Sequence, residues 1–262
     1  MEKSTLRICS RSDAGIRMEN EDTCGVRRYD HPLGTVALLI VADGLGGHPA
    51  GEVASALAVD ALMKATGEQL PLLQDLGIGS MTRLMESAFM EANNVVIAIG
   101  ERDERCNGLG TTMVAAMVNE ADECIIGNIG DSRAYLISKR IHRITRDHSR
   151  VQELVDQGIL TPSEAECHPM KNIVTRIIGR RGEMPDIFSC NLKESRLLLC
   201  SDGLMDGMGE PEIFTVMRGM GIPGICDTLV EKAREKSRDN ITVIVAEWTG
   251  RNDRQKESGL FL

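Results

Sequence analysis

Three apolar segments of this chain end on an aspartate, and a fourth aspartate stands immediately before another apolar segment. The junctions are 37–42 with Asp43-Gly44, 124–130 with Asp131-Ser132, 196–201 with Asp202-Gly203, and Asp239-Asn240 with 241–248. Short segments rich in Val, Ile and Leu and flanked by Gly are typical of buried strands. We therefore expect each carboxylate to lie where a strand leaves or enters a sheet.

The segments 196–201 and 241–248 would place two of these carboxylates together if they pair as antiparallel strands. The end of one strand then lies beside the start of the other, which puts Asp202 next to Asp239. Carboxylates crowded at a sheet edge repel one another unless a cation lies between them. Because no matching His or Cys accompanies these oxygen ligands, the pattern predicts Mg²⁺ or Mn²⁺.

Length and charge restrict the class of protein. A chain of 262 residues with 42% hydrophobic content suits one domain with a sizeable core. The net charge of −9, without any Lys/Arg tract, disfavours nucleic acid as the main partner. Residues 1–6 are polar where a signal peptide is apolar, and no apolar run approaches the ~20 residues of a membrane span. We expect a cytoplasmic protein with no membrane partner.

The eight cysteines are scattered, without a Cys-x-x-Cys pair, and several lie inside apolar runs. This distribution indicates reduced core thiols and neither a disulfide framework nor a zinc site. Cys190 and Arg196 have the Cys-x5-Arg spacing of a thiol phosphatase. The residues between them contain Glu194 and no Gly, so they offer no cradle of backbone N–H groups to a phosphate. We reject that mechanism, and no P-loop motif is present either.

Periodicity predicts the elements. Strands are expected at 7–10, 35–42, 111–118, 124–128, 133–137, 141–144, 187–190, 197–201 and 241–248, and helices at 50–65, 84–99, 210–218 and 223–236. The polar segment 145–182 predicts a surface flap with one short helix at 151–155, and 249–262 predicts a loosely held tail. Grouped strands with helices in separate blocks indicate an α+β fold, and we expect one domain over 1–248.

Eight motifs cover nearly the whole chain. They are RSDAGIRMENED (11–22), VADGLGGHPAGEVAS (41–55), GLGTTMVAAMV (108–118), NIGDSRAYLI (128–137), ITRDHSRVQELVDQGILTPSEA (144–165), HPMKNIVTRIIG (168–179), LLLCSDGLMDGM (197–208) and SRDNITVIVAEW (237–248). In wording and order they resemble the metal-dependent protein phosphatase family, the type 2C serine/threonine phosphatases, in its compact prokaryotic form. The resemblance implies a four-layer α-β-β-α sandwich of two antiparallel sheets flanked by helices, and hydrolysis of phosphoserine and phosphothreonine in proteins.

The resemblance also implies metal ligands. Asp43 would bridge two Mn²⁺ or Mg²⁺ ions, Gly44 would add its backbone carbonyl, and Asp202 and Asp239 would complete the protein ligands of the first ion. A water held between two such ions loses its proton near neutral pH and would attack phosphorus in line, without a phosphoenzyme. Asp131, with Asp202, resembles the ligand pair of a third and weaker ion in prokaryotic members.

Other residues take supporting roles by the same resemblance. Arg17 would grip the phosphate oxygens with its guanidinium group, and Glu21 and Asp22 would orient metal-bound waters. Larger eukaryotic relatives have a candidate general-acid His two residues after the bridging aspartate, where this chain has Leu45. The nearest histidine here is His48, and two roles for it stay open: substrate binding or leaving-group protonation, and support of the Gly-rich turn.

Two other functions fit parts of the pattern. A carboxylate-bound metal pair could serve a phosphodiesterase, although the acidic charge disfavours a nucleic-acid substrate. An inactive phosphatase fold could bind phosphoproteins, but such a module should have lost a metal ligand, and this chain retains all of them. The expected partners are phosphoproteins and a cognate serine/threonine kinase, and the chain is expected to be a monomer.

Overall fold

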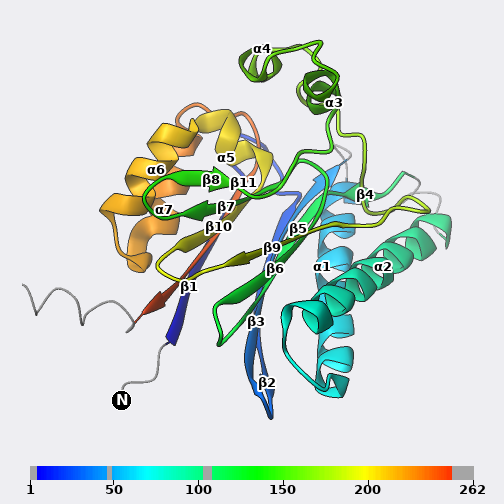
Figure 1. Ribbon diagram of the computed structural model, residues 1–262. Coiled ribbons are helices and arrows are strands. Elements are labelled where there is room, and N and C mark those ends of the chain that lie inside the picture. Colours follow the sequence, from blue (N-terminus) through cyan, green and yellow to red (C-terminus); the bar gives the residue numbers. More distant parts are fainter. Residues whose placement is uncertain (1–4, 46–48, 103–107, 250–262) are drawn as a thin grey trace, which may run out of the picture.

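Two antiparallel sheets lie face to face in the computed structural model, which describes residues 5–45, 49–102 and 108–249. The first sheet has the strand order β1-β11-β10-β7-β8, and the second has the order β2-β3-β5-β6-β9 with β4 paired to β3. Helices cover the outer face of each sheet (Figure 1). The expected α-β-β-α sandwich is confirmed.

The elements have the following bounds. The first sheet contains β1 (Thr5–Asp13), β7 (Arg133–Ile137), β8 (Ile141–Arg143), β10 (Arg196–Cys200) and β11 (Ile241–Thr249). The second contains β2 (Asp22–His31), β3 (Gly34–Leu45), β4 (Gly110–Thr111), β5 (Met113–Asn119), β6 (Glu123–Ile129) and β9 (Asp186–Asn191). The helices are α1 (Pro49–Gln69), the 3₁₀ turn η1 (Leu70–Leu72), α2 (Ile78–Arg102), α3 (Arg150–Asp156), α4 (Pro162–Glu166), α5 (Asp202–Gly207), α6 (Glu210–Gly219) and α7 (Ile222–Arg234).

The position of β3 explains its continuous apolar sequence. Residues 36–42 of this strand are all buried. Leu38 and Ile40 pack into the cluster under α1 and α2, whereas Leu39 and Val41 pack into the cluster between the two sheets. A strand that is buried on both faces has no polar side to alternate with its apolar side. The strand therefore runs through the centre of the fold and delivers its last residues to one end of the sandwich.

The strand β2 and the short helical elements η1, α4 and α5 were not expected. The strand β2 is an edge strand that carries Arg27, Arg28 and Asp30, and charged side chains on an edge hide the strand pattern. The helix α5 has only six residues, and α4 has five. Helices this short give no measurable periodicity.

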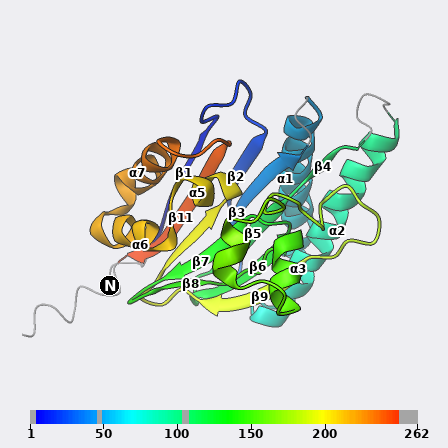
Figure 2. The ribbon, with the colours of Figure 1, turned by 90° about the horizontal axis from the view of Figure 1, so that it is seen from above.

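Residues 145–182, which we call the flap, contribute no strand to either sheet. They carry α3 and α4, which stand away from the sandwich at the end where β4 and α5 also lie (Figure 1). The view from above shows α3 over the strands of the sandwich (Figure 2). Within the described residues, no helix combines the length and the apolarity needed to span a membrane.

A disulfide joins Cys9 of β1 to Cys226 of α7, across 217 residues of sequence. The expectation that all eight cysteines are reduced is therefore wrong for this pair. Sequence spacing could not reveal it, because the contact depends on α7 packing over β1. The five remaining cysteines of the described residues are free thiols.

Loss of this disulfide should destabilise the fold. Cys226→Ser, or reductant added to the parent, is expected to lower the free energy of unfolding by about 2–4 kcal/mol, because the bond restricts the unfolded chain. Urea denaturation with and without reductant measures the change. The matched control is Cys167→Ser, which alters an exposed flap cysteine and should change nothing. An equal effect of reductant on Cys226→Ser and on the parent would show that the bond is not responsible.

Candidate metal centre

Five aspartates meet at one end of the sandwich, and we call this set the acidic rim: Asp22, Asp43, Asp131, Asp202 and Asp239. Asp43 stands directly opposite Asp22 in the pairing of β3 with β2. Asp131 lies where the chain passes from β6 in one sheet to β7 in the other, and Asp202 opens α5 after β10. The rim therefore forms only when both sheets are assembled.

Asp43 departs from the expected position at a strand end. The strand β3 continues to Leu45, because Gly44 and Leu45 pair with β4. The backbone N–H of Thr112 and the hydroxyl of Thr111 both donate to the Asp43 carbonyl oxygen, each at 2.8 Å. Asp43 is thus held inside a strand, which fixes its backbone more firmly than a turn would.

The predicted antiparallel pairing of β10 with β11 is confirmed, with Cys200 opposite Val243. The glycine after Asp202 has a specific reason, because a Cβ at Gly203 would lie 1.9 Å from the carbonyl oxygen of Asn240. Only Gly lets the start of α5 approach the start of β11 this closely. Burial is the largest cause of the raised pKa of Asp202, and the charge of Asp239, which this contact brings near, raises it further.

A second close approach occurs at Gly44. A Cβ there would lie 2.2 Å from the carbonyl oxygen of Gly51 and 2.7 Å from that of Glu21. The missing side chain makes room for α1 and for the residue before β2. The Glu21 carboxylate also lies close to Gly51, since a Cβ on that glycine would be 2.9 Å from it. Glu21 is therefore aimed at the first turn of α1, beside the rim.

Burial and mutual repulsion raise the pKa values of Asp22, Asp43, Asp131 and Asp202. Burial is the largest cause of each shift, and it raises the pKa of Asp202 to about 6, of Asp22 to about 7 and of Asp131 to about 8. The pKa of Asp43 is raised well above its ordinary value, by burial and then by repulsion from the other rim aspartates. A hydrogen bond from the Ser201 hydroxyl to Asp22, 2.7 Å long, opposes the shift there.

Three carboxylate oxygens near the rim are buried without a hydrogen-bond partner: Oε1 of Glu21, Oδ1 of Asp22 and Oδ1 of Asp202. Unpaired buried oxygens of this kind are costly, and a hard divalent cation with water ligands suits them. Across 5–45, 49–102 and 108–249, no three Asp, Glu, His or Cys side chains already form a compact metal cage. The donor set is entirely oxygen, which fits Mn²⁺ or Mg²⁺.

Arg17 lies at the rim, where its Nη2 is 2.9 Å from Oδ2 of Asp239. Its Nε also donates to the carbonyl oxygen of Arg238 at 3.0 Å. Both members of the ion pair are partly exposed, so the guanidinium group stays accessible from solvent. The sequence-based placement of Arg17 beside the metal ligands is consistent with this geometry.

Asn240 is a site residue that the sequence analysis did not single out. Its Nδ2 donates to the carbonyl oxygens of Ala14 at 3.0 Å and Glu19 at 2.9 Å, and its Oδ1 accepts from the N–H of Glu21 at 2.9 Å. One side chain thereby holds both ends of the loop that carries Arg17. In the sequence, only its position directly after Asp239 indicates that Asn240 belongs to the site.

Two further residues considered from the sequence are His48 and Cys190. His48 lies outside the described residues. Cys190 is in β9 of the second sheet, whereas Arg196 is in β10 of the first, where it bonds Glu247 at 2.5 Å. The rejection of a thiol phosphatase site is therefore confirmed.

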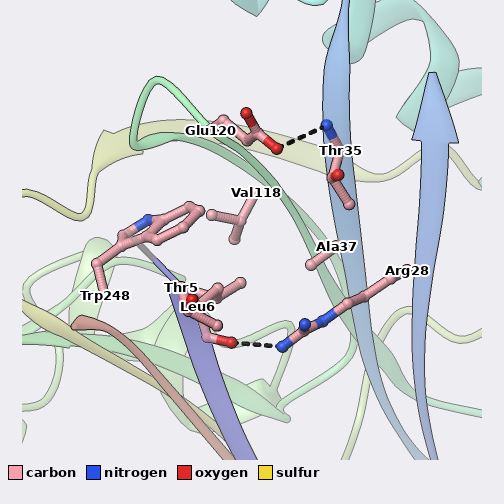
Figure 3. A pocket seen from close by; sticks show the side chains of 8 residues that line it. All are labelled: Thr5, Leu6, Arg28, Thr35, Ala37, Val118, Glu120 and Trp248. Carbon is pink, nitrogen blue, oxygen red and sulfur yellow. Dashed lines mark hydrogen bonds between the residues drawn. The ribbon is translucent and has the colours of Figure 1, made fainter. Parts of the chain in front are cut away.

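The rim is distinct from a cavity of about 170 Å³ at the other end of the sandwich (Figure 3). That cavity is lined by residues from the starts of β1 and β3 and the ends of β5 and β11, among them Leu6, Ala37, Val118 and Trp248. No rim aspartate lines it. A second cavity lies beside the end of α2 and is also free of rim aspartates.

Comparison with known proteins agrees with the site. The family model for protein phosphatase 2C matches residues 14–224. The serine/threonine phosphatase stp of Listeria monocytogenes is 37% identical over 245 residues, which cover 90% of this chain and 94% of that protein. The chain belongs to the protein phosphatase 2C family.

Solved structures give the same result. Stp1 of Staphylococcus aureus, a serine/threonine phosphatase, matches with a TM-score of 0.84 and 34% identity, covering 94% of this chain and 96% of that one. The catalytic domain of the phosphatase PstP, solved in complex with two manganese ions, matches with a TM-score of 0.79 and 32% identity, covering 94% and 100%.

The raised pKa values give a pH-dependent prediction. The folded, metal-free protein binds protons at the rim more tightly than the unfolded chain does. The contribution of these protons to the free energy of unfolding is fully present below about pH 4. It is lost as the pH rises through about 6 to 8. Because Mn²⁺ competes with these protons, its stabilising effect should grow over the same interval.

Thermal unfolding at about pH 5.5 and about pH 8, with EDTA or with excess Mn²⁺, tests this. The difference in Tm between the two conditions should widen by several degrees at the higher pH, at about 2–4 °C per kcal/mol for a chain of this size. An equal difference at both pH values would contradict the raised pKa values.

Proposed function

We propose that this chain is a metal-dependent phosphatase that hydrolyses phosphoserine and phosphothreonine in proteins. The observation that carries the proposal is a rim of buried carboxylates with unpaired oxygens, placed beside the accessible guanidinium group of Arg17. Relatives named serine/threonine phosphatases, with similar length and fold, support the substrate class.

Asp43, Asp202 and Asp239, with the carbonyl oxygen of Gly44, would hold two Mn²⁺ or Mg²⁺ ions. Asp131 with Asp202 would hold a third. The two manganese ions of the PstP structure support this choice of metal. Bound ions of this kind lower the pKa of a coordinated water and offset negative charge on phosphoryl oxygens.

The side chains around the metal ligands would bind the phosphate group and orient water molecules. Arg17 can present two N–H donors to phosphate oxygens, and the contact with Asp239 keeps it at the rim. Asp22, held by Ser201, and Glu21, held beside α1, would accept hydrogen bonds from ordered waters. A phosphate bound between Arg17 and the rim would thus meet positive charge on one side and proton acceptors on the other.

The cellular setting is also a proposal. We expect a cytoplasmic monomer that opposes a cognate serine/threonine kinase. Disulfides are rare in the cytosol, so the redox state of Cys9 and Cys226 in cell extracts bears directly on location.

Removing the charge of a metal ligand should abolish turnover and preserve the fold. Asp43→Asn and Asp239→Asn are each expected to lower kcat by more than ~10²-fold, because the site loses an ion that activates water. Mn²⁺-dependent hydrolysis of p-nitrophenyl phosphate and of a phosphopeptide measures this.

The matched control is Asp60→Asn, the same change at an exposed position on α1, which should retain parent activity. If Asp43→Asn retained normal turnover with its metals bound, the ligand assignment would be wrong. If the parent itself lacked Mn²⁺-dependent activity, the inactive binding module would be the better description.

Replacing Arg17 tests the phosphate-binding role. Arg17→Lys keeps the charge and loses the two-pronged donor geometry, so KM should rise about 10-fold or more, in line with ~1.5–3 kcal/mol for hydrogen bonds to charged groups. Steady-state kinetics with a phosphopeptide measures KM and kcat separately. Unchanged values for both would show that Arg17 is only a partner of Asp239.

A further inference from the structure

His148 stands at the point where the flap leaves the sandwich, and it is buried, with 8% of its surface exposed. At this point the chain segment that enters the flap and the segment that returns from it are hydrogen-bonded to each other. The N–H of Thr175 donates to the His148 carbonyl oxygen, and the N–H of Arg150 donates to that of Ile173, each at 2.8 Å. Residues 148–150 and 173–175 form the neck of the flap.

The same residue makes a reciprocal pair with Gly130. The His148 N–H donates to the Gly130 carbonyl oxygen at 2.9 Å, and the Gly130 N–H donates to Nδ1 of His148 at 3.0 Å. Gly130 has a φ of +111°, and a Cβ there would lie 2.4 Å from Cβ of Thr112. Only glycine therefore fits at this position without strain, and the next residue is Asp131.

The two ring nitrogens of His148 face different parts of the structure. Nδ1 accepts the hydrogen bond from Gly130, whereas Nε2 lies 3.2 Å from Oδ2 of Asp186 and 2.8 Å from Nη1 of Arg176. Arg176 of the flap donates to Oδ1 of Asp186 at 2.8 Å. The imidazole thus connects the turn before Asp131 on one side to the returning end of the flap on the other. Burial, the largest effect, lowers the pKa of His148, which agrees with a neutral ring.

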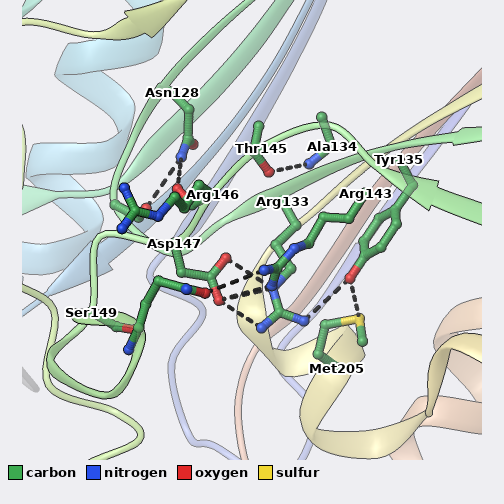
Figure 4. Close-up of polar contacts among 12 residues, drawn as sticks. Asn128, Arg133, Ala134, Tyr135, Arg143, Thr145, Arg146, Asp147, Ser149 and Met205 are labelled. Atoms are coloured by element: carbon green, nitrogen blue, oxygen red, sulfur yellow. Dashed lines mark hydrogen bonds and ion pairs between the residues drawn. The ribbon is translucent and has the colours of Figure 1, made fainter. Parts of the chain in front are cut away.

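The neck has a separate anchor that does not involve this imidazole. Asp147 receives two hydrogen bonds from Nε of Arg133, at 3.0 and 3.1 Å, and one from Nη2 at 2.6 Å (Figure 4). Nη1 of Arg133 donates to the Tyr135 hydroxyl, which contacts the sulfur of Met205 on α5. This buried ion pair attaches the loop to the sheet, so the flap should stay attached when the His148 side chain changes.

We propose that His148 is a positioning residue that couples the flap to Asp131, through Nδ1 to the Gly130 turn and through Nε2 to the paired side chains of Arg176 and Asp186. The inference rests on the proposed role of Asp131 as a ligand of a third ion. Binding of that ion fixes the Asp131 turn, and the imidazole passes this restriction to the flap. Conversely, displacement of the flap alters the turn and weakens the third ion.

Two substitutions separate the two contacts. The Oδ1 of His148→Asn replaces Nδ1 as the acceptor for Gly130 but cannot reach Asp186. The side chain of His148→Gln reaches Asp186 but leaves Gly130 without its acceptor. Calorimetric Mn²⁺ titration should show the weakest binding event weakened about 10–100-fold in His148→Gln, in the range typical for residues that support metal ligands. The same event should be nearly unchanged in His148→Asn.

Hydrogen exchange then tests the coupling itself. In the parent, Mn²⁺ at a concentration that fills the weakest site should slow exchange of flap amides. His148→Asn should lose this Mn²⁺-dependent slowing, and Asp186→Ala should do the same. The matched control is His142→Gln, the same change at an exposed position on β8, which should behave like the parent.

Three outcomes would overturn the proposal. One is that Mn²⁺ slows flap exchange equally in the parent and in all folded variants. Another is that His148→Gln binds every ion with parent affinity, which makes the pair with Gly130 merely structural. The third is that the parent has no weak binding event that Asp131→Ala removes. That last result would remove the premise of a third ion, while phosphatase activity dependent on Asp43 would show that the proposed function still stands.

Discussion

Repulsion among the five rim aspartates is the constraint on which the rest of the structure depends. Burial and neighbouring charges raise the pKa of Asp43 and Asp131, so the folded protein opposes full ionisation of its own site. At Asp43 the largest influences are burial and the charges of the four other rim aspartates, and all of them raise its pKa. What holds the carboxylates together is the packing of two sheets whose central strands, such as β3, are buried on both faces. The carboxylates therefore repel one another while the packing of the sheets keeps them close together. A bound cation would relieve this repulsion.

Close backbone approach supplies the precision of the site. Gly203 lies against the carbonyl oxygen of Asn240, Gly44 lies against that of Gly51, and Gly130 lies against Thr112. In each case a glycine adjoins a rim aspartate, and any side chain there would force the neighbouring segment away. An Asp-Gly pair at the end of an apolar run would ordinarily indicate a turn. Here the glycine allows two elements to approach closely, and this approach positions the aspartate beside it at the rim.

The parts of the site that depend on local sequence patterns could be predicted from the sequence. The strand pairing that brings Asp202 to Asp239 follows from two apolar runs and their ends. The disulfide at Cys9 and the contacts of Asn240 with Ala14 join residues more than two hundred positions apart. No local pattern specifies such contacts, because they depend on how finished elements pack. The edge strand β2 was missed for a related reason. Its charged residues suit an exposed sheet edge, and they interrupt the apolar pattern by which a buried strand is recognised.

The two sides of the rim differ in how firmly they are held. The loop of Arg17 is fixed by three hydrogen bonds to Asn240, so a phosphate would meet a rigid contact on that side. The part of the flap beyond its neck, which carries α3 and α4, has a partly exposed ion pair from Lys171 to Asp206, and a pair of this kind contributes little in water. A rigid phosphate contact opposite a more loosely attached flap separates two requirements. The chemistry needs fixed geometry, whereas admitting different phosphoproteins needs a surface that can adjust.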